Sequence, residues 1–246
     1  MWENITADRC EKYIERYFGK KGKTGEPKPA ITISRAEGAG GLTASSELSR
    51  YLQEKTTAHE EWTVFDQMLV TKVLEVFGLK GVGQFMKEEH KGTVTDAFEE
   101  FIGLHPSTWS LVERTNATIL RLAQIGNCIL VGRGGNLVTK DMPNVFHVRL
   151  VGSFEKRVEQ AMKAFNYDQK TAAKYVQKKD HGRKRYVKDN FDADIEDPLL
   201  YHIVINTDLV TYEEAARIIG SEVIFRHNLD APAKPEIMTG HRAAVF

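Results

Sequence analysis

The chain has 246 residues, 41% of them hydrophobic and 28% charged, a balance that predicts a globular protein rather than a disordered or fibrous one. Its 34 basic residues equal its 34 acidic residues, so the net charge gives no sign of a nucleic-acid partner. No apolar run approaches the roughly 20 residues that cross a membrane, and two cysteines are too few for a disulfide framework. We therefore expect a soluble, cytoplasmic protein that binds neither nucleic acid nor membrane.

The first predicted unit is an appended segment, residues 1–29. Apolar residues three and four apart indicate a short amphipathic helix near residues 10–18, and a lysine- and glycine-rich linker follows it. At the other end, residues 228–246 contain two prolines and no periodic pattern, which predicts an irregular tail. We therefore expect the functional site between these two segments.

Between them, short apolar or β-branched runs alternate with segments of helical periodicity. The expected strands are residues 30–33, 63–65, 128–131, 145–150 and 203–205. The expected helices lie near residues 48–52, 68–77, 109–124, 153–165, 168–188 and 212–225. Residues 78–108 lose this periodicity, which indicates an inserted lobe. The alternation predicts an α/β fold, with a parallel sheet covered by helices on both faces.

A glycine-rich loop joins the first of these strands to the helix after it. In a parallel sheet such a loop lies outside the carboxyl end of a strand, where backbone N–H groups and the helix dipole favour an anion. The candidate phosphate ligands in this loop are Arg35, Gly38, Ala39, Gly40, Gly41, Leu42 and Thr43. The loop departs from the standard G-x-x-x-x-G-K-[ST] pattern, because Gly41 stands at the lysine and Leu42 at the hydroxyl residue. An ordinary strand-to-helix turn is the alternative.

Two further strand ends carry candidate residues. Arg133 lies in the loop Gly132-Arg133-Gly134-Gly135 after the strand at 128–131, so it is expected in the same crevice. Its planar guanidinium suits a bidentate contact with phosphate, although it could instead pair with a carboxylate at the sheet edge. Asp66 directly follows the strand at 63–65, and its alternative role is to cap the next helix.

A run of positive charge lies between Lys174 and Lys188, where seven basic residues stand against the single acid Asp180. One hypothesis is a solvated helix face. The other is a lid whose cations close over transferring phosphates. The histidines form no H-x-x-x-H or H-E-x-x-H pair and no G-x-S-x-G motif exists, so neither a metal hydrolase nor a serine hydrolase is expected.

The order of these motifs resembles the cytidylate kinase-like family of P-loop nucleoside monophosphate kinases. The matching segments are residues 31–35, 38–41, 65–66, 129–136, 144–148, 179–186, 197–201 and 205–208, within a resemblance that covers about residues 30–225. The resemblance implies a three-layer fold of the P-loop NTPase type over residues 30–227. It also implies a helical acceptor lobe at about residues 66–125 and a lid at about residues 168–195.

The resemblance further implies ATP-dependent phosphoryl transfer to a nucleoside monophosphate such as CMP, or to a similar small acceptor, with ATP and Mg²⁺ as cofactors. It places the ATP phosphates on residues 38–43 and the acceptor near Asp66 and Arg133. Lys179, Arg183 and Arg185 would be the lid cations that act in catalysis together with Arg133. It assigns no metal ligand, and Thr43 is the candidate hydroxyl for Mg²⁺.

The departures from this family pattern leave the activity open. Cytidylate kinases proper carry a lysine where this chain has Gly41, and a carboxylate where it has Gly134. Without that lysine, charge neutralisation falls to Mg²⁺, Arg35 and the lid. The alternatives are a catalytically inactive nucleotide-binding regulatory module of the same fold and an α/β protein that binds no nucleotide. The base of the acceptor and the oligomeric state, a homo-oligomer included, stay open.

Overall fold

The computed structural model describes residues 12–13, 28–56, 61–66 and 108–229. The helix predicted at 68–77, most of the predicted lobe at 78–108 and the tail from residue 230 lie outside them. Of the predicted N-terminal helix, the structure describes Lys12 and Tyr13. Tyr13 is buried, its hydroxyl donates a hydrogen bond of 2.6 Å to the carbonyl of Gly126, and its ring meets Phe65 edge-on. This part of the appended segment therefore packs on the core of its own chain.

Five strands form one parallel sheet in the order β2-β3-β1-β4-β5. They are β1 (Ala30–Arg35), β2 (Thr63–Asp66), β3 (Cys128–Gly132), β4 (Val145–Val151) and β5 (Ile203–Asn206). The helices are α2 (Gly41–Lys55), α5 (Thr108–Ile125), α6 (Gly135–Val138), α7 (Phe154–Phe165), α8 (Gln169–Phe191) and α9 (Tyr212–Arg226), with a 3₁₀ turn η1 (Pro198–Leu200).

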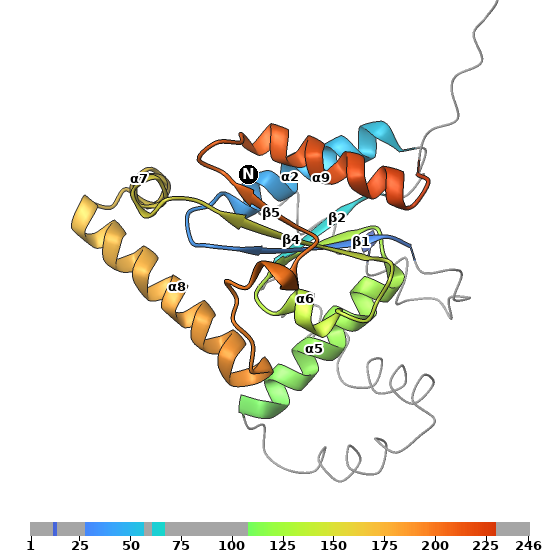
Figure 1. Ribbon diagram of the computed structural model, residues 1–246, viewed down its shortest axis with the longest axis horizontal. Helices are drawn as coiled ribbons and strands as arrows, with labels where there is room; N and C mark the ends of the chain where they lie inside the picture. Colours follow the sequence, from blue (N-terminus) through green and yellow to red (C-terminus); the bar gives the residue numbers. More distant parts are fainter. Residues whose placement is uncertain (1–11, 14–27, 57–60, 67–107, 230–246) are drawn as a thin grey trace, which may run out of the picture.

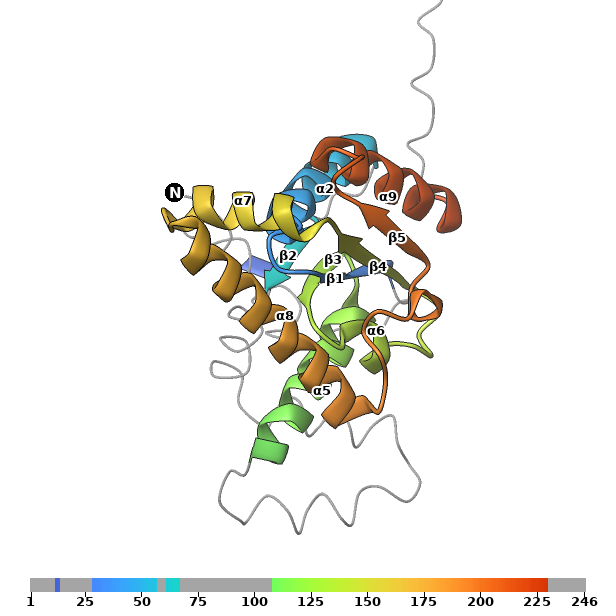
Figure 2. The same ribbon diagram turned by 60° about the vertical axis from the view of Figure 1, so that its left-hand side comes forward.

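The elements stack in three layers (Figure 1). Helices α2 and α9 cover one face of the sheet, and α5 and α6 cover the other. Helices α7 and α8 lie beyond the carboxyl ends of the strands, as Figure 2 also shows. The prediction of an α/β fold with a parallel sheet covered on both faces is therefore confirmed.

Burial explains why the strands have continuous apolar sequences. β1, β3 and β4 are central strands, and side chains on both of their faces are buried. Ile31, Ile129 and Val148 belong to the larger core, which the sheet forms with α2 and α9. A smaller core on the opposite face includes Phe65 and Leu122.

The short helix α6 is the one described helix that the periodicity did not predict. It has only four residues, which is too few to show a hydrophobic repeat. Its N-cap is Gly134 in the left-handed conformation, in place of the Ser, Thr, Asp or Asn that usually marks a helix start. The tertiary structure therefore adds a turn of helix directly after Arg133.

The chain leaves β1 and β3 in opposite directions. The two strands are neighbours, with Ser34 in register with Gly132. After β1 the chain passes to α2 on one face of the sheet, and after β3 it passes to α6 on the other (Figure 1). The two glycine loops therefore separate at the carboxyl edge of the sheet, where parallel α/β proteins bind their ligands.

Gly40 offers a direct test of the loop conformation. It has φ of 75°, and a Cβ atom at this position would overlap the ring of Tyr212. We expect Gly40→Ala to lower the free energy of unfolding by about 1–3 kcal/mol, because the alanine adds backbone strain to the overlap. Urea denaturation measures the change, and a Gly40→Ala/Tyr212→Ala pair should recover only the part due to overlap. Wild-type stability in Gly40→Ala would contradict this account.

Candidate active site

The loop between β1 and α2 turns the chain directly into the start of a helix. Gly38 and Gly40 both have positive φ, of 80° and 75°, which turns the chain sharply into α2. Helix α2 begins at Gly41 without a side-chain cap and without an acidic residue in its first turn. Because the first N–H groups of a helix have no partner within it, this end of α2 suits an anion.

A cavity of about 350 Å³ opens beside this loop, between the carboxyl ends of β1 and β4 and helices α7 and α8. The basic residues that line it are Arg35, Arg149, Arg157, Arg183 and Lys184. The acidic ones are Asp180 and Glu196. Because five basic groups meet two acidic ones in a chain of zero net charge, positive charge is concentrated at this cavity.

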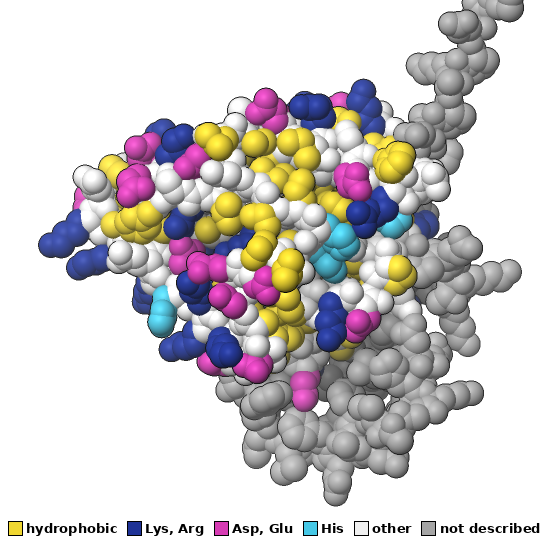
Figure 3. Space-filling model, viewed as in Figure 1, with side chains coloured by type: hydrophobic (Ala, Val, Ile, Leu, Met, Phe, Trp, Pro, Cys, Tyr) yellow, Lys and Arg dark blue, Asp and Glu magenta, His cyan; other side chains and the backbone are white. Residues whose placement is uncertain are grey.

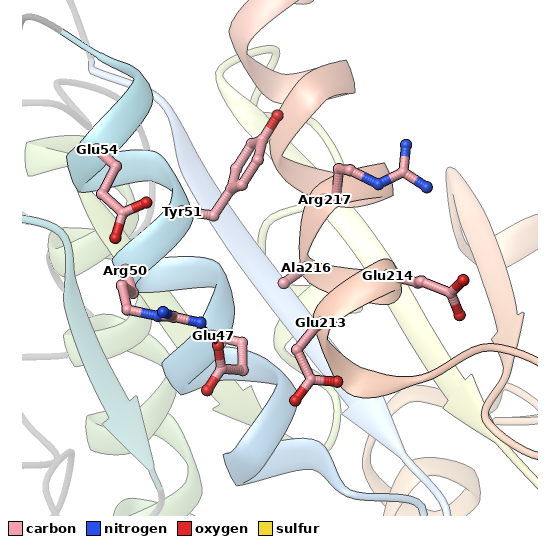
Figure 4. Close-up of a pocket in the computed structure, with 8 residues that line it drawn as sticks. All are labelled: Glu47, Arg50, Tyr51, Glu54, Glu213, Glu214, Ala216 and Arg217. Carbon is pink, nitrogen blue, oxygen red and sulfur yellow. Dashed lines mark hydrogen bonds and ion pairs between the residues drawn. The ribbon is translucent and has the colours of Figure 1, made fainter.

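A second hollow, of about 260 Å³, lies between α2 and α9 (Figure 4). Its charged groups are Glu47, Glu54, Glu213 and Glu214 against Arg50 and Arg217. An excess of carboxylates repels a phosphate, so the cavity beside the glycine loop is the candidate site for anions.

Helix α8 is fastened to the glycine loop by paired charges. Arg183 forms an ion pair with Glu37, and Asp180 accepts a hydrogen bond of 2.8 Å from the backbone N–H of Glu37. Arg157 of α7 pairs with the other Asp180 oxygen at 2.5 Å and donates to the Glu37 carbonyl at 3.0 Å. The loop and the two helices therefore form one connected network.

Helix α8 also reaches the loop after β3. The Arg133 guanidinium lies 4.0 Å from the centre of the Tyr186 ring, a cation–π contact. Burial lowers the pKa of Arg133, and Arg183 contributes to the same direction. Arg183 lies about one turn before Tyr186 and Asp180 about two turns before it, so one helix contacts both glycine loops.

Arg35 stands at the end of β1 and lines the cavity. Burial, and next the nearby Arg183, lower its pKa to about 10, while Glu37 and Asp66 act in the opposite direction. Its guanidinium therefore keeps its charge at neutral pH. Asp66, the predicted carboxylate at the end of β2, is thus within electrostatic reach of Arg35.

The sequence analysis missed Arg149, which lies within β4. Only 6% of this residue is exposed, and Nη1 donates a hydrogen bond of 3.0 Å to the hydroxyl of Ser34. Among the described residues no carboxylate forms an ion pair with it. A buried charge without a counter-charge is costly, so an anion in the cavity would stabilise it. The available signal was an arginine in the middle of the apolar run 145–151.

The basic residues of α8, which include the predicted lid cations Lys179, Arg183 and Arg185, separate into two groups. Arg183 and Lys184 line the cavity, and Lys184 pairs with Glu196 at 2.5 Å. Lys179 and Arg185 are exposed on α8, and the Lys179 ammonium lies 5.5 Å from the Tyr175 ring centre. Figure 3 shows basic side chains standing out along this helix. Part of the basic run is therefore a solvent-exposed helix face, and part of it lines the cavity, while the lid role stays a prediction.

The candidate Mg²⁺ ligand, Thr43, lies in the first turn of α2 and is exposed, as is Leu42. In the described part of the chain, no three His, Cys, Asp or Glu side chains gather where they could hold a metal. Mg²⁺ usually takes one or two protein ligands and completes its shell with phosphates and water, so a single hydroxyl at this position fits its chemistry.

His147 lies two residues before Arg149, and its Nδ1 is 2.9 Å from the Thr32 hydroxyl. Burial, with His202 as a second cause, lowers the pKa of His147 to about 4. Because the unfolded chain binds this proton more tightly, stability is highest above pH 6.5 and falls as the pH drops toward 4, by on the order of 3 kcal/mol.

We therefore expect His147→Asn to lose less stability than the wild type between pH 7 and pH 5. Denaturation curves at the two pH values measure this difference, with His181→Asn on the exposed side of α8 as the control. An equal loss in wild type and His147→Asn would exclude His147 as the source.

Comparison with known proteins agrees with this fold. Residues 30–209 match the cytidylate kinase-like family. The crystal structure of an uncharacterized protein from Eubacterium ventriosum is 19% identical, with 80% of this chain and 98% of that chain covered and a TM-score of 0.59. Shikimate kinase from Bacteroides thetaiotaomicron is 13% identical over 80% of this chain and 96% of its own, with a TM-score of 0.43. No curated protein matches the chain, and no described helix is long and apolar enough to span a membrane.

Proposed function

Because the chain belongs to the cytidylate kinase-like family, we propose that it transfers a phosphoryl group from ATP to a nucleoside monophosphate, with CMP as the first acceptor to test. The observation that carries the proposal is the cavity at the carboxyl edge of the sheet. Five basic side chains face two acidic ones there, beside the uncapped N-terminus of α2. Two phosphate-bearing molecules that meet at one place need such an excess of positive charge.

The glycine loop and the residues around it would hold the donor. Backbone N–H groups at the start of α2 would donate hydrogen bonds to phosphate oxygens, and Arg35 would add a full charge from the end of β1. Arg183 lies opposite, on α8, and its Nη1 is buried without a hydrogen-bond partner among the described residues. A phosphate oxygen near this atom would supply the missing acceptor.

The loop after β3 would hold the acceptor phosphate. The Arg133 guanidinium lies over the Tyr186 ring, and this contact would orient its N–H groups before a ligand arrives. Such preorganisation matters, because phosphoryl transfer depends mainly on positioning and charge stabilisation. Mg²⁺, when bound, would neutralise charge on the donor phosphates, and Thr43 is the residue that would hold it.

A second function is favoured by one specific observation. Arg183 and Arg157 are already paired with Glu37 and Asp180, so part of the positive charge at the loop is neutralised within the chain. A module that binds a nucleotide without transferring phosphate would tolerate this pairing. It would also tolerate the absence of lysine at Gly41.

The experiment that separates the two functions measures ADP production from Mg-ATP with purified protein. CMP, UMP, AMP, GMP and dCMP are each supplied as acceptor and compared with a reaction without acceptor. Turnover with one of them would establish the kinase and identify its substrate. Nucleotide-dependent thermal stabilisation without turnover would favour the binding module, since a ligand that binds the folded state stabilises it.

A further inference from the structure

Gly41 stands where the standard phosphate loop has its lysine, and the structure gives a spatial reason for the glycine. A Cβ atom at Gly41 would lie 2.9 Å from Cγ, 3.2 Å from Cδ and 3.4 Å from Nε of Arg35. Gly41 is not among the residues with positive φ. Its backbone therefore accepts any residue, and the space is taken by Arg35.

We propose that Arg35 supplies, from the end of β1, the positive charge that the standard loop takes from a lysine at position 41, and that Gly41 is required to make room for it. The inference rests on the proposed function, because it assumes that the loop binds a nucleotide polyphosphate. Arg35 and Gly41 then act together. Gly41 lacks the lysine side chain of the standard loop, and Arg35 supplies the lost positive charge in the space that Gly41 leaves.

Three observations support this replacement of the loop lysine by Arg35. The Arg35 side chain passes over the first residue of α2, the helix end that favours an anion. It also lines the basic cavity. Among the described residues no carboxylate forms an ion pair with Arg35, whereas Arg157 and Arg183 are both paired. Of these three arginines, Arg35 is therefore the one with which no described carboxylate pairs.

An arginine in place of the lysine would also change how the phosphate is held. A lysine ammonium acts as a point charge, whereas a guanidinium presents a planar fork that can contact two oxygens at once. The guanidinium is anchored on the strand and the lysine of the standard loop on the helix, so the charge would approach the ligand from the sheet.

The test uses four variants of the full chain: Arg35→Ala, Gly41→Ala, Arg35→Ala/Gly41→Ala and Arg35→Ala/Gly41→Lys. Binding of Mg²⁺ with a non-hydrolysable ATP analogue is measured by calorimetry, and the denaturation midpoint is measured without nucleotide. Arg217→Ala, in the hollow between α2 and α9 (Figure 4), is the matched arginine control.

We expect Arg35→Ala to weaken analogue binding about tenfold or more, since it removes a charged contact. Gly41→Ala should lower the denaturation midpoint and weaken binding in the wild-type background. It should do neither in the Arg35→Ala background, because the overlap is gone. Arg35→Ala/Gly41→Lys should bind the analogue more tightly than Arg35→Ala/Gly41→Ala. These two double variants differ only in the atoms beyond Cβ of residue 41.

Wild-type binding by Arg35→Ala would overturn the inference, as would equal binding by the two double variants. If Gly41→Ala lowered the denaturation midpoint equally in the wild-type and the Arg35→Ala backgrounds, the proposal that Gly41 makes room for Arg35 would be overturned. Failure of the proposed function is distinguishable, because a protein that binds the analogue but never turns over still gives all of these binding results. A wild-type chain that binds no analogue would contradict both.

Discussion

Replacing Arg149 with methionine is expected to weaken the binding of either the donor or the acceptor nucleotide by about 10–100-fold, because the cavity loses a buried charged donor of hydrogen bonds. The same change should leave the free energy of unfolding unchanged or raise it by about 1 kcal/mol, since it replaces an unpaired buried charge with an apolar side chain of similar size. Calorimetry with Mg-ADP and with CMP would show which nucleotide is affected. Urea denaturation would measure stability.

These two readouts separate a ligand-binding arginine from a structural one. A purely structural Arg149 would lose stability on substitution and keep its nucleotide affinity, the opposite result. Ser34→Ala is the companion variant, because it removes the hydroxyl that accepts from Arg149 and leaves the charge in place. We expect it to retain most of the affinity.

Replacing Arg133 with alanine should lower the turnover number by about a hundredfold or more, because the acceptor phosphate loses its preorganised charge. Affinity for Mg-ATP should change less than about twofold, since the donor is expected on the other glycine loop. Steady-state kinetics at saturating ATP and calorimetry measure the two quantities. Equal activity in Arg133→Ala would remove this residue from the mechanism.

Tyr186 provides a control for the position of Arg133. Tyr186→Phe keeps the aromatic face under the guanidinium, which lies 4.0 Å from the ring centre, and should keep activity. Tyr186→Ala removes that support and should raise the KM for the acceptor more than it lowers the turnover number. A loss of activity in Tyr186→Phe would instead indicate that the phenol hydroxyl takes part.

A network of paired charges joins α8 to the glycine loop. Its members are Glu37, Asp180, Arg157 and Arg183. It holds α8 against the glycine loop through two carboxylates that occupy donors a phosphate could use. A nucleotide bound at this loop, as proposed, would therefore compete with contacts within the chain. The ADP assay separates the two proposed functions, the kinase and the binding module.

The sequence by itself determined the fold, and it placed the candidate site at the carboxyl ends of the strands as a prediction. Apolar runs at 30–33, 128–131 and 145–150 predicted buried strands, because only a sheet covered on both faces needs such continuous hydrophobicity. The two glycine loops could be assigned to the same edge of the sheet from chain order alone, since the carboxyl ends of parallel strands meet there. The roles assigned to Arg133, Lys179 and Arg185 stay predictions.

Only the tertiary structure decided which charges belong to the cavity. Local sequence does not show which side of α8 faces the sheet, so Arg183 and Arg185 were equivalent until the fold placed one inside and one outside. Arg149 had the pattern of a strand residue, and its meaning depends on the Ser34 hydroxyl, distant in sequence. Gly41 looked like a lost lysine until Arg35 was found against it. Periodicity reports which residues are buried, whereas charge pairing and steric exchange depend on contacts between residues far apart along the chain.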